Sequence, residues 1–339
     1  MNWLPSHPAF DGFYPQAQHW LPLQTSFAEI LQAYSGVRGD VFSLTGKGWG
    51  KGFYRIEAKS PVFIKCVEES RFEKQREADR IAAYVMLSCG IKTSCCLAGF
   101  PITLPEQQYS LFVYPYVNSG FIGPSPANMT KLGELIARTH QCLAQAPFKD
   151  QIKSQGLARF SWIESTLDFF ASEPIVIPDQ ASAILQSIPA GFLRVMQENA
   201  QPIHGDLNVG NILQDEQDEL ILIDFENSYF SWSSPLVDLA FVMERFILIR
   251  EDIDKQACLL SLLQAYKRLS DVCFHDASKV IHVLQALSVR SLLLLTELAR
   301  QGGEVRDSEW QKFIYLYHAT TEYQPLLDEV FKDLKRLSQ

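Results

Sequence analysis

One compound pattern near the middle of this 339-residue chain restricts its fold more strongly than length or composition does. Residues 204–213 read H-G-D-L-N-V-G-N-I-L, and a second apolar run ending in L-I-D-F follows, with Asp224 as its acid. Asn211 lies five positions after Asp206, and Asp224 lies thirteen positions after Asn211. Short apolar runs on both sides of a polar turn predict a hairpin, which brings these three side chains together.

A carboxylate, an amide and a second carboxylate in this order suit phosphoryl transfer of the kinase type. Asp206 would accept the proton of a substrate hydroxyl, while Asn211 and Asp224 would hold magnesium against the phosphates. Asp and Asn are also common turn residues, so the alternative is that Asp206 and Asn211 cap turns and Asp224 merely ends a strand. The whole pattern, at this spacing, favours the catalytic interpretation.

The apolar pattern divides the chain into a strand-rich first third and a helix-rich remainder. At this length two folded lobes are expected. Expected strands lie at 41–44, 52–56, 62–67, 93–98 and 109–117, and expected helices at 26–34, 70–88, 129–146, 158–172, 180–199, 235–250, 252–271, 276–302 and 307–336. We therefore expect a β-rich lobe over 1–117, with a leader at 1–36, and a helical lobe over 118–339.

Residues 204–213 and 222–240 resemble the aminoglycoside phosphotransferase and choline kinase family, the small-molecule branch of the protein-kinase-like fold. The wider resemblance extends over roughly residues 37–300. It implies an α+β fold of two lobes: a small antiparallel sheet with one helix, and a larger, mostly helical lobe. It also implies Asp206 as the catalytic base, Asn211 and Asp224 as magnesium ligands, ATP as the donor, and His204 as a structural histidine that holds the loop.

The same resemblance implies a nucleotide-binding lysine on the third strand of the small lobe and an acidic partner on the helix that follows. Lys65 fits the lysine because it stands in the apolar run 62–67. Glu77 fits the partner, and Glu73, one turn earlier, is its rival. Each residue alone would usually be a solvated surface charge. Their position before the loop motif favours the nucleotide-binding interpretation.

Glycines alternate at positions 46, 48, 50 and 52, between the first two expected strands. Without a Cβ, the backbone at Gly48 and Gly50 can approach a phosphate closely, and Lys47 and Lys51 add positive charge. The pattern is neither G-x-G-x-x-G nor a Walker sequence, so a flexible hairpin turn is the alternative. The expected hinge strand, which could equally be a buried aromatic strand, supplies the remaining nucleotide contacts: Tyr114, Tyr116 and Val117.

The segment after Asp224 is short. Only thirteen residues lie between Asp224 and Asp238, and no A-P-E triplet follows. Such a segment is too short to dock a peptide, which disfavours a protein kinase. The small-molecule branch of the family carries this short form, and the resemblance implies that Asp238 buttresses the catalytic loop from a helix.

Charge narrows the range of partners. With 30 basic and 39 acidic side chains the net charge is −9, which argues against binding to nucleic acid or to anionic membranes. Residues 100–239 hold 6 basic and 16 acidic side chains, a balance of −10, and this favours a cationic acceptor. Carboxylate and aromatic faces that suit an ammonium group follow Asp224, although the aromatic residues would also pack the loop: Glu226, Asn227, Tyr229 and Trp232.

Seven cysteines without a C-x-x-C pair, and a start without basic residues before Arg38, indicate a reducing, cytoplasmic location, and no membrane span is expected. We therefore expect an ATP- and Mg²⁺-dependent phosphotransferase, a monomer or homodimer, that acts on a hydroxyl of a small cationic metabolite or antibiotic. GTP is an alternative to ATP as the donor. The alternatives are a catalytically silent nucleotide-binding scaffold on the same fold and, less favoured, a protein kinase.

Overall fold

The structure, a computed structural model, describes residues 20–44, 51–104, 107–172, 176–270 and 276–337. These residues form two compact units. The sheet unit comprises the described residues of Pro15–Phe121 and Leu213–Tyr229. The helical unit comprises those of Ile122–Ile212 and Phe230–Gln339.

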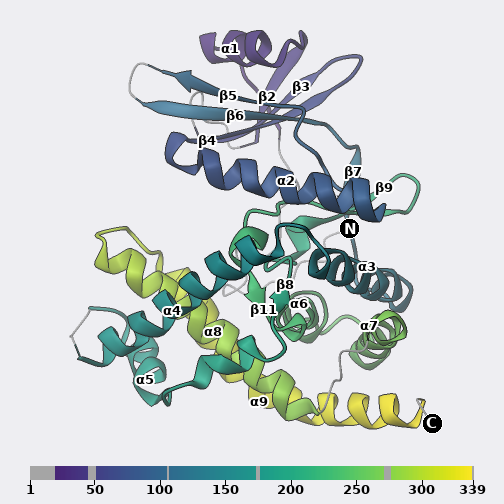
Figure 1. The fold of residues 1–339 in the computed structure, drawn as a ribbon, viewed down its shortest axis with the longest axis vertical. Helices are drawn as coiled ribbons and strands as arrows, with labels where there is room; N and C mark the ends of the chain where they lie inside the picture. Colours follow the sequence, from purple (N-terminus) through teal and green to yellow (C-terminus); the bar gives the residue numbers. More distant parts are fainter. Residues whose placement is uncertain (1–19, 45–50, 105–106, 173–175, 271–275, 338–339) are drawn as a thin grey trace. The chain divides into compact units, whose positions relative to one another are not determined.

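The sheet unit is built on a six-stranded antiparallel sheet in the order β1-β2-β3-β4-β6-β5 (Figure 1). Its strands are β1 (Leu21–Pro22), β2 (Asp40–Ser43), β3 (Gly52–Glu57), β4 (Val62–Glu68), β5 (Ala98–Thr103) and β6 (Gln108–Pro115). The strand expected at 93–98 is wrong, because β5 begins where that run ends and pairs with β6 along its length. Thr93 instead forms a single bridge with Leu222.

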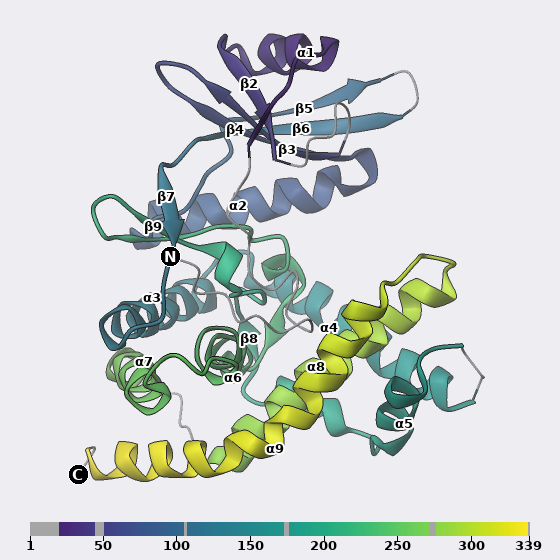
Figure 2. The ribbon, with the colours of Figure 1, turned by 180° about the vertical axis from the view of Figure 1, so that it is seen from behind.

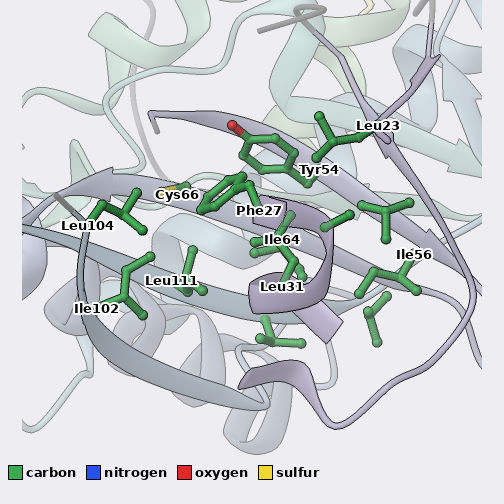
Figure 3. Packing of buried hydrophobic residues seen from close by; sticks show 14 residues of the cluster. Leu23, Phe27, Leu31, Tyr54, Ile56, Ile64, Cys66, Ile102, Leu104 and Leu111 are labelled. Carbon is green, nitrogen blue, oxygen red and sulfur yellow. The ribbon is translucent and has the colours of Figure 1, made fainter. Parts of the chain in front are cut away.

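Alternation along the strands sends one set of side chains towards α1 (Ser26–Ser35) and the other towards α2 (Phe72–Cys89), and the two helices lie on opposite faces of the sheet (Figures 1 and 2). On the α1 face, Phe27 and Leu31 pack against Tyr54, Ile64 and their neighbours (Figure 3). On the α2 face, the buried set contains Val67, Phe112 and Tyr114. Lys65 alternates with Ile64 and therefore points to the α2 face.

A smaller sheet explains why the hairpin after the catalytic loop belongs to the sheet unit. Its order is β10-β9-β7, formed by β10 (Leu220–Leu222), β9 (Ile212–Asp215) and β7 (Ser119–Phe121). The Leu222 N–H donates to the Lys92 carbonyl at 3.0 Å, and Lys92 Nζ lies 2.9 Å from Asp215 Oδ2. The chain therefore returns to the sheet unit at Leu213, which a single boundary at 117/118 does not describe.

The helical unit is formed by α3 (Pro126–Ala144), α4 (Lys149–Ser172), α5 (Asp179–Ser187), α6 (Pro235–Val242), α7 (Lys255–Leu269), α8 (Ala277–Arg300) and α9 (Asp307–Arg336). A two-stranded ribbon pairs β8 (Gln201–Pro202) with β11 (Trp232–Ser233). The helix expected at 180–199 is interrupted, because the chain turns at Pro189 and at Gly191, whose φ is +76°, before the short helix η3 (Phe192–Gln197).

Helix starts in this unit follow from local side chains. Ser125 accepts a hydrogen bond from the Asn128 N–H and Pro126 occupies the first turn of α3, while Asp276 caps α8 by accepting from the Lys279 N–H. By length and composition α8 could cross a membrane, but 67% of that window is buried inside the fold. It packs against α9 and α6 and is a core helix of this unit (Figure 2).

Candidate active site

The predicted catalytic loop lies in the helical unit, between β8 and the short helix η4 (Val209–Asn211). The Asn208 amide donates to Asp206 Oδ1 at 3.0 Å, and the Asn211 amide donates to the Asp206 backbone oxygen at 2.9 Å. Asn208 Oδ1 in turn accepts from the Gly210 N–H at 2.7 Å. These bonds fix the direction of the Asp206 carboxylate, as a preorganised general base requires.

Asp238 on α6 anchors the start of this loop. Its Oδ2 accepts from the His204 N–H at 2.9 Å and its Oδ1 from the Gly205 N–H at 2.8 Å. His140 Nε2 on α3 lies 3.0 Å from Asp238 Oδ2, and His140 Nδ1 lies 2.9 Å from the Tyr266 hydroxyl. A carboxylate can only accept, so Nε2 carries the proton and Nδ1 accepts from Tyr266. Asp238 therefore holds the start of the loop through two hydrogen bonds. The network extends to His140 and Tyr266, which sequence analysis missed.

Two further residues missed from the sequence lie near Asp206. Arg159 on α4 and Arg290 on α8 both interact electrostatically with its carboxylate. Neither residue stands in a motif, and each comes from a helix remote in sequence from the loop. They place positive charge beside the expected catalytic base.

In the sheet unit, Lys65 of β4 binds the acidic segment that follows β10. Lys65 Nζ lies 3.2 Å from Asp224 Oδ1 and also binds Glu226 Oε1. Asp224 adopts φ +61°, a left-handed conformation that is uncommon for a residue other than glycine. The Asp224 side chain is 38% exposed and Lys65 only 13%, so the carboxylate remains accessible to a metal ion.

Glu226, predicted to bind the acceptor, is instead the centre of a cationic cluster. Besides Lys65, it binds Arg71 at 2.7 Å and Lys74 at 3.3 Å. Burial on its own would raise the pKa of Glu226, but the three cations, led by Lys65, outweigh burial and hold that pKa below its ordinary value. The carboxylate of Glu226 is thus engaged by the chain's own cations, and its predicted role at an acceptor ammonium stays a prediction.

Among the described residues the structure does not pair Lys65 with Glu77. Glu77 accepts from Arg80 Nε at 2.8 Å on its own helix, and the rival Glu73 binds Arg76 at 2.6 Å. On α2, it is Asp79 whose pKa is lowered by the charge of Lys65, against the larger effect of burial. Two residues along a helix correspond to a rotation of about 200°, so Glu77 and Asp79 face different directions.

Asp79 forms a small polar cluster with the expected hinge strand. Its Oδ1 accepts from the Tyr114 hydroxyl at 2.9 Å, and the Gln75 amide also donates to that hydroxyl at 2.9 Å. The Asp79 Oδ2 atom is buried without a hydrogen-bond partner. Burial raises the pKa of Asp79 to about 6, although Tyr114, Gln75 and Lys65 oppose the shift.

Two further predicted nucleotide contacts, Tyr116 and Val117, interact with neighbouring residues of the sheet unit. The Tyr116 N–H donates to the Pro61 carbonyl at 3.0 Å, and the guanidinium of Arg55 lies 4.0 Å from the Tyr116 ring centroid. The Val117 carbonyl accepts from the Ser119 hydroxyl at 3.2 Å. The predicted phosphate-contacting glycines lie outside the described residues: Gly48 and Gly50.

The remaining predicted acceptor residues are divided between the two units. Asn227 and Tyr229 belong to the sheet unit, whereas Trp232 belongs to the helical unit, where it forms part of β11. Lys153 Nζ of α4 lies 5.3 Å from the Trp232 ring centroid. The aromatic face proposed for an acceptor ammonium therefore already carries a cation of the chain.

Asn211 in the helical unit and Asp224 in the sheet unit each offer an oxygen of the kind that magnesium prefers. Among the described residues no group of three or more His, Cys, Asp or Glu side chains could hold a metal by itself. Mg²⁺, however, is usually held by one or two protein oxygens together with substrate phosphates and water. Asn211 uses its amide nitrogen within the loop, which leaves its oxygen as a ligand, and Asp224 offers a carboxylate.

Residues 111–271 match the model of the phosphotransferase enzyme family. The matched stretch includes Asp206, Asn211, Asp224 and Asp238. No curated protein sequence matches the chain. The family match confirms, over this stretch, the predicted resemblance to the aminoglycoside phosphotransferase and choline kinase family.

Solved structures of small-molecule kinases share the fold. Choline kinase LicA from Streptococcus pneumoniae is 16% identical, with 88% of this chain and 100% of that chain covered and a TM-score of 0.55. Amicoumacin kinase hAmiN, in complex with AMP-PNP, Ca²⁺ and Ami, is 15% identical over 89% and 95%, with a TM-score of 0.59. A microcompartment-associated aminopropanol kinase is 12% identical over 94% and 95%, with a TM-score of 0.53. The predicted kinase-like fold is thereby confirmed.

Proposed function

We propose that the protein transfers the γ-phosphoryl group of ATP to a hydroxyl group of a small molecule, with Mg²⁺ bound at the phosphates. The observation that carries this proposal is the catalytic loop. The Asp206 carboxylate is held by Asn208, its backbone oxygen is held by Asn211, and the loop is anchored by Asp238. A loop held in this way suits a reaction in which catalysis rests on positioning and charge.

Each residue then has a distinct task. Asp206 accepts the proton of the acceptor hydroxyl while that oxygen bonds to the γ-phosphorus and the bond to the β-phosphate oxygen breaks, releasing ADP. Lys65 pairs with the nucleotide phosphates, and Asn211 and Asp224 would hold the metal ion. Magnesium, when bound, supplies the charge that neutralises the phosphate oxygens.

Nucleotide binding requires Lys65 to exchange partners. Lys65 pairs with Asp224 and Glu226, and a triphosphate competes with both carboxylates for its Nζ. Arg71 and Lys74 can keep Glu226 neutralised when Lys65 leaves it. Asp79, whose Oδ2 has no partner, is the carboxylate on α2 within electrostatic reach of Lys65.

The acceptor is a small molecule with a hydroxyl group. The negative balance of residues 100–239 favours a cationic one, and the solved relatives include kinases named for choline and aminopropanol. Two of the residues predicted to bind a cationic acceptor, Glu226 and Trp232, nevertheless already contact lysines of the chain itself. The charge of the acceptor therefore depends on other side chains near Asp206.

Acceptor-dependent ADP release over a panel of hydroxyl compounds tests the proposal. Asp206→Asn should lower kcat by about 100-fold or more, because proton acceptance is lost, while Mg·ATP binding is unchanged. Asp168→Asn, an exposed aspartate on α4, is the matched control and should keep full activity. More than about a tenth of the rate remaining in Asp206→Asn would show that Asp206 is a turn residue.

Calorimetry separates the enzyme from a silent scaffold. Asp224→Ala should remove the magnesium dependence of ATP binding, since it deletes a metal ligand. Unchanged Mg·ATP affinity in this variant would refute the metal assignment. Tight Mg·ATP binding by the wild type without turnover of any acceptor, or of water, would favour the scaffold.

A further inference from the structure

Three cationic side chains of the sheet unit converge on a single carboxylate. Glu226 Oε1 binds Lys65. Glu226 Oε2 lies 2.7 Å from Arg71 Nη2 and 3.3 Å from Lys74 Nζ. The Glu226 side chain is only 9% exposed, so both of its oxygens are turned away from solvent and towards these cations. The proposed function assigns Lys65 to the nucleotide phosphates but gives Arg71 and Lys74 no ligand of their own.

The connection between β4 and α2 brings Arg71 and Lys74 close to Lys65. Arg71 is the last residue of the short helix η2 (Glu69–Arg71), and Lys74 lies in the first turn of α2, three positions later. Residues three apart lie on the same side of a helix. Lys65 alternates with Ile64 along β4 and faces α2. The three cations therefore meet from consecutive elements of one short stretch of chain.

A pair on the same helix shows what an ordinary surface ion pair looks like here. Arg76 lies 2.6 Å from Glu73, and both side chains are more than half exposed. One cation neutralises one carboxylate, and gathering two more adds desolvation and mutual repulsion. At Glu226 three cations nevertheless gather on one buried carboxylate. This arrangement points to a ligand that carries more negative charge than Glu226 does.

Arg71 has donors left for such a ligand. A guanidinium carries five N–H groups, and Arg71 donates to Glu226 through Nη2. Among the described residues its side chain forms no other hydrogen bond or ion pair. The side chain is 38% exposed, so a ligand can reach it from solvent. Arg71 can therefore hold Glu226 and a second anionic oxygen group at the same time.

We propose that Arg71 and Lys74, together with Lys65, bind phosphate oxygens of the donor nucleotide. The inference rests on the proposed function and adds two residues to its donor site. Guanidinium and ammonium groups both bind phosphates, and the guanidinium fork also fixes the direction of the phosphate. With Asp224 and Glu226 counted against the three cations, these five side chains have a formal charge of +1, which attracts a polyanion.

Four ligands separate the phosphates from the rest of the nucleotide: ATP, ADP, adenosine and inorganic tripolyphosphate. Calorimetry on the full chain, with excess Mg²⁺ and at constant ionic strength, compares wild type with Arg71→Met and Lys74→Met. Each variant should bind Mg·ATP and Mg·tripolyphosphate about tenfold more weakly, and adenosine as wild type does. If ADP binding is unchanged, the two cations contact the terminal phosphate. An equal loss for ADP assigns them to the inner phosphates.

A second background separates direct contact with phosphate from support of Glu226. If Arg71 only neutralised Glu226, its removal would have no effect once Glu226→Gln has removed that charge. The proposal predicts that Arg71→Met still weakens Mg·ATP binding about tenfold in the Glu226→Gln background. Arg71→Lys should recover part of the loss, since it keeps the charge without the fork. Arg76→Met, which removes a 60% exposed arginine of α2, is the control and should change nothing.

Thermal melting without ligand shows whether each variant folds, and if Arg71→Met does not, Lys74→Met carries the test. Wild-type affinity for Mg·ATP in both methionine variants would overturn the inference, as would a loss that vanishes in the Glu226→Gln background. Adenosine binding weakened as much as ATP binding would also overturn it. If Mg·ATP binding depends on Arg71 but no acceptor is phosphorylated, the proposed function fails while the phosphate site stands.

Discussion

The side chains predicted for catalysis and those predicted for nucleotide binding are held in different ways in the two units. In the helical unit, Asp206 and Asp238 are fixed by amides, backbone N–H groups and an imidazole. In the sheet unit, Lys65 and Glu226 are fixed by opposite charges. Directed hydrogen bonds from neutral donors define one geometry, whereas a cluster of long charged side chains can exchange partners. Under the proposed function, the helical unit presents a preformed loop for catalysis, and the sheet unit presents a cluster that the phosphates of the nucleotide would rearrange.

The strongest test of this contrast is removal of the loop anchor. Asp238→Ala leaves the His204 and Gly205 N–H groups and His140 buried without their acceptor. We expect the free energy of unfolding to fall by about 3–5 kcal/mol and activity to be lost, because a buried network loses its shared partner. Urea unfolding measures the first effect, and Asp168→Asn is the control. A loss below about 1 kcal/mol would show that the loop does not depend on this network.

The second prediction concerns the packing of α4 against β11, which the substitution Gly156→Ala disturbs. In Gly156→Ala the new Cβ would lie 2.5 Å from Trp232 Cβ and 2.6 Å from its backbone nitrogen, so α4 must shift away from β11. Overpacking of this kind costs about 1–3 kcal/mol. Gly120→Ala is the matched control, since no atom lies within 4 Å of the added Cβ there. Equal melting temperatures for the two variants would contradict the close seating of α4.

The third prediction concerns Asp79, the carboxylate on α2 whose pKa is affected by the charge of Lys65. The pKa of Asp79 is raised by burial to about 6, so between pH 4 and 6 the folded protein binds more protons than the unfolded chain. Its contribution to the free energy of unfolding therefore falls as pH rises through this range, by about 2 kcal/mol after allowance for partial exposure.

Asp79→Asn should remove this slope and be more stable than wild type at pH 7, while the oxygen that accepts from Tyr114 is kept. Denaturant unfolding of both proteins at pH 4 and pH 7 gives the difference. Parallel pH profiles would mean that Asp79 is not desolvated in solution.

Much of the catalytic loop was accessible from the sequence because its members lie close together along the chain. Asp206 and Asn211 share one motif, and Asp238 follows within the next segment. Arg159 and Arg290 were not accessible, since they reach Asp206 only through the packing of α4 and α8, and no local pattern distinguishes them from other helical arginines. Pairing between strands, which likewise depends on distant partners, explains the shifted position of β5.

The charge of a whole segment and the pattern of a helix left two points of the candidate site undetermined. The excess of carboxylates in residues 100–239 includes Asp215 and Glu219, which bind Lys92 on a turn of the sheet unit. These two carboxylates are thus paired within the sheet unit. Charged residues occur on several sides of α2, so periodicity alone could not tell whether Glu77 or Asp79 faces Lys65. Packing against β6 selects Asp79, through Tyr114.

The smallest expected effect is a change in Mg·ATP affinity, and it tests whether nucleotide phosphates compete with Glu226 for the cations of the sheet unit. Glu226→Gln removes the charge that competes with phosphates for Lys65, Arg71 and Lys74. We expect Mg·ATP to bind about tenfold more tightly, a gain of about 1.4 kcal/mol, because its phosphates meet cations that no longer need to leave a carboxylate. The KM for the acceptor should change little. Glu68→Gln, which removes the carboxylate that pairs with the exposed Lys51, is the matched control for calorimetry. Weaker nucleotide binding in Glu226→Gln would mean that Glu226 positions the cations for the phosphates instead of competing with them, and the contrast between the two units would then disappear.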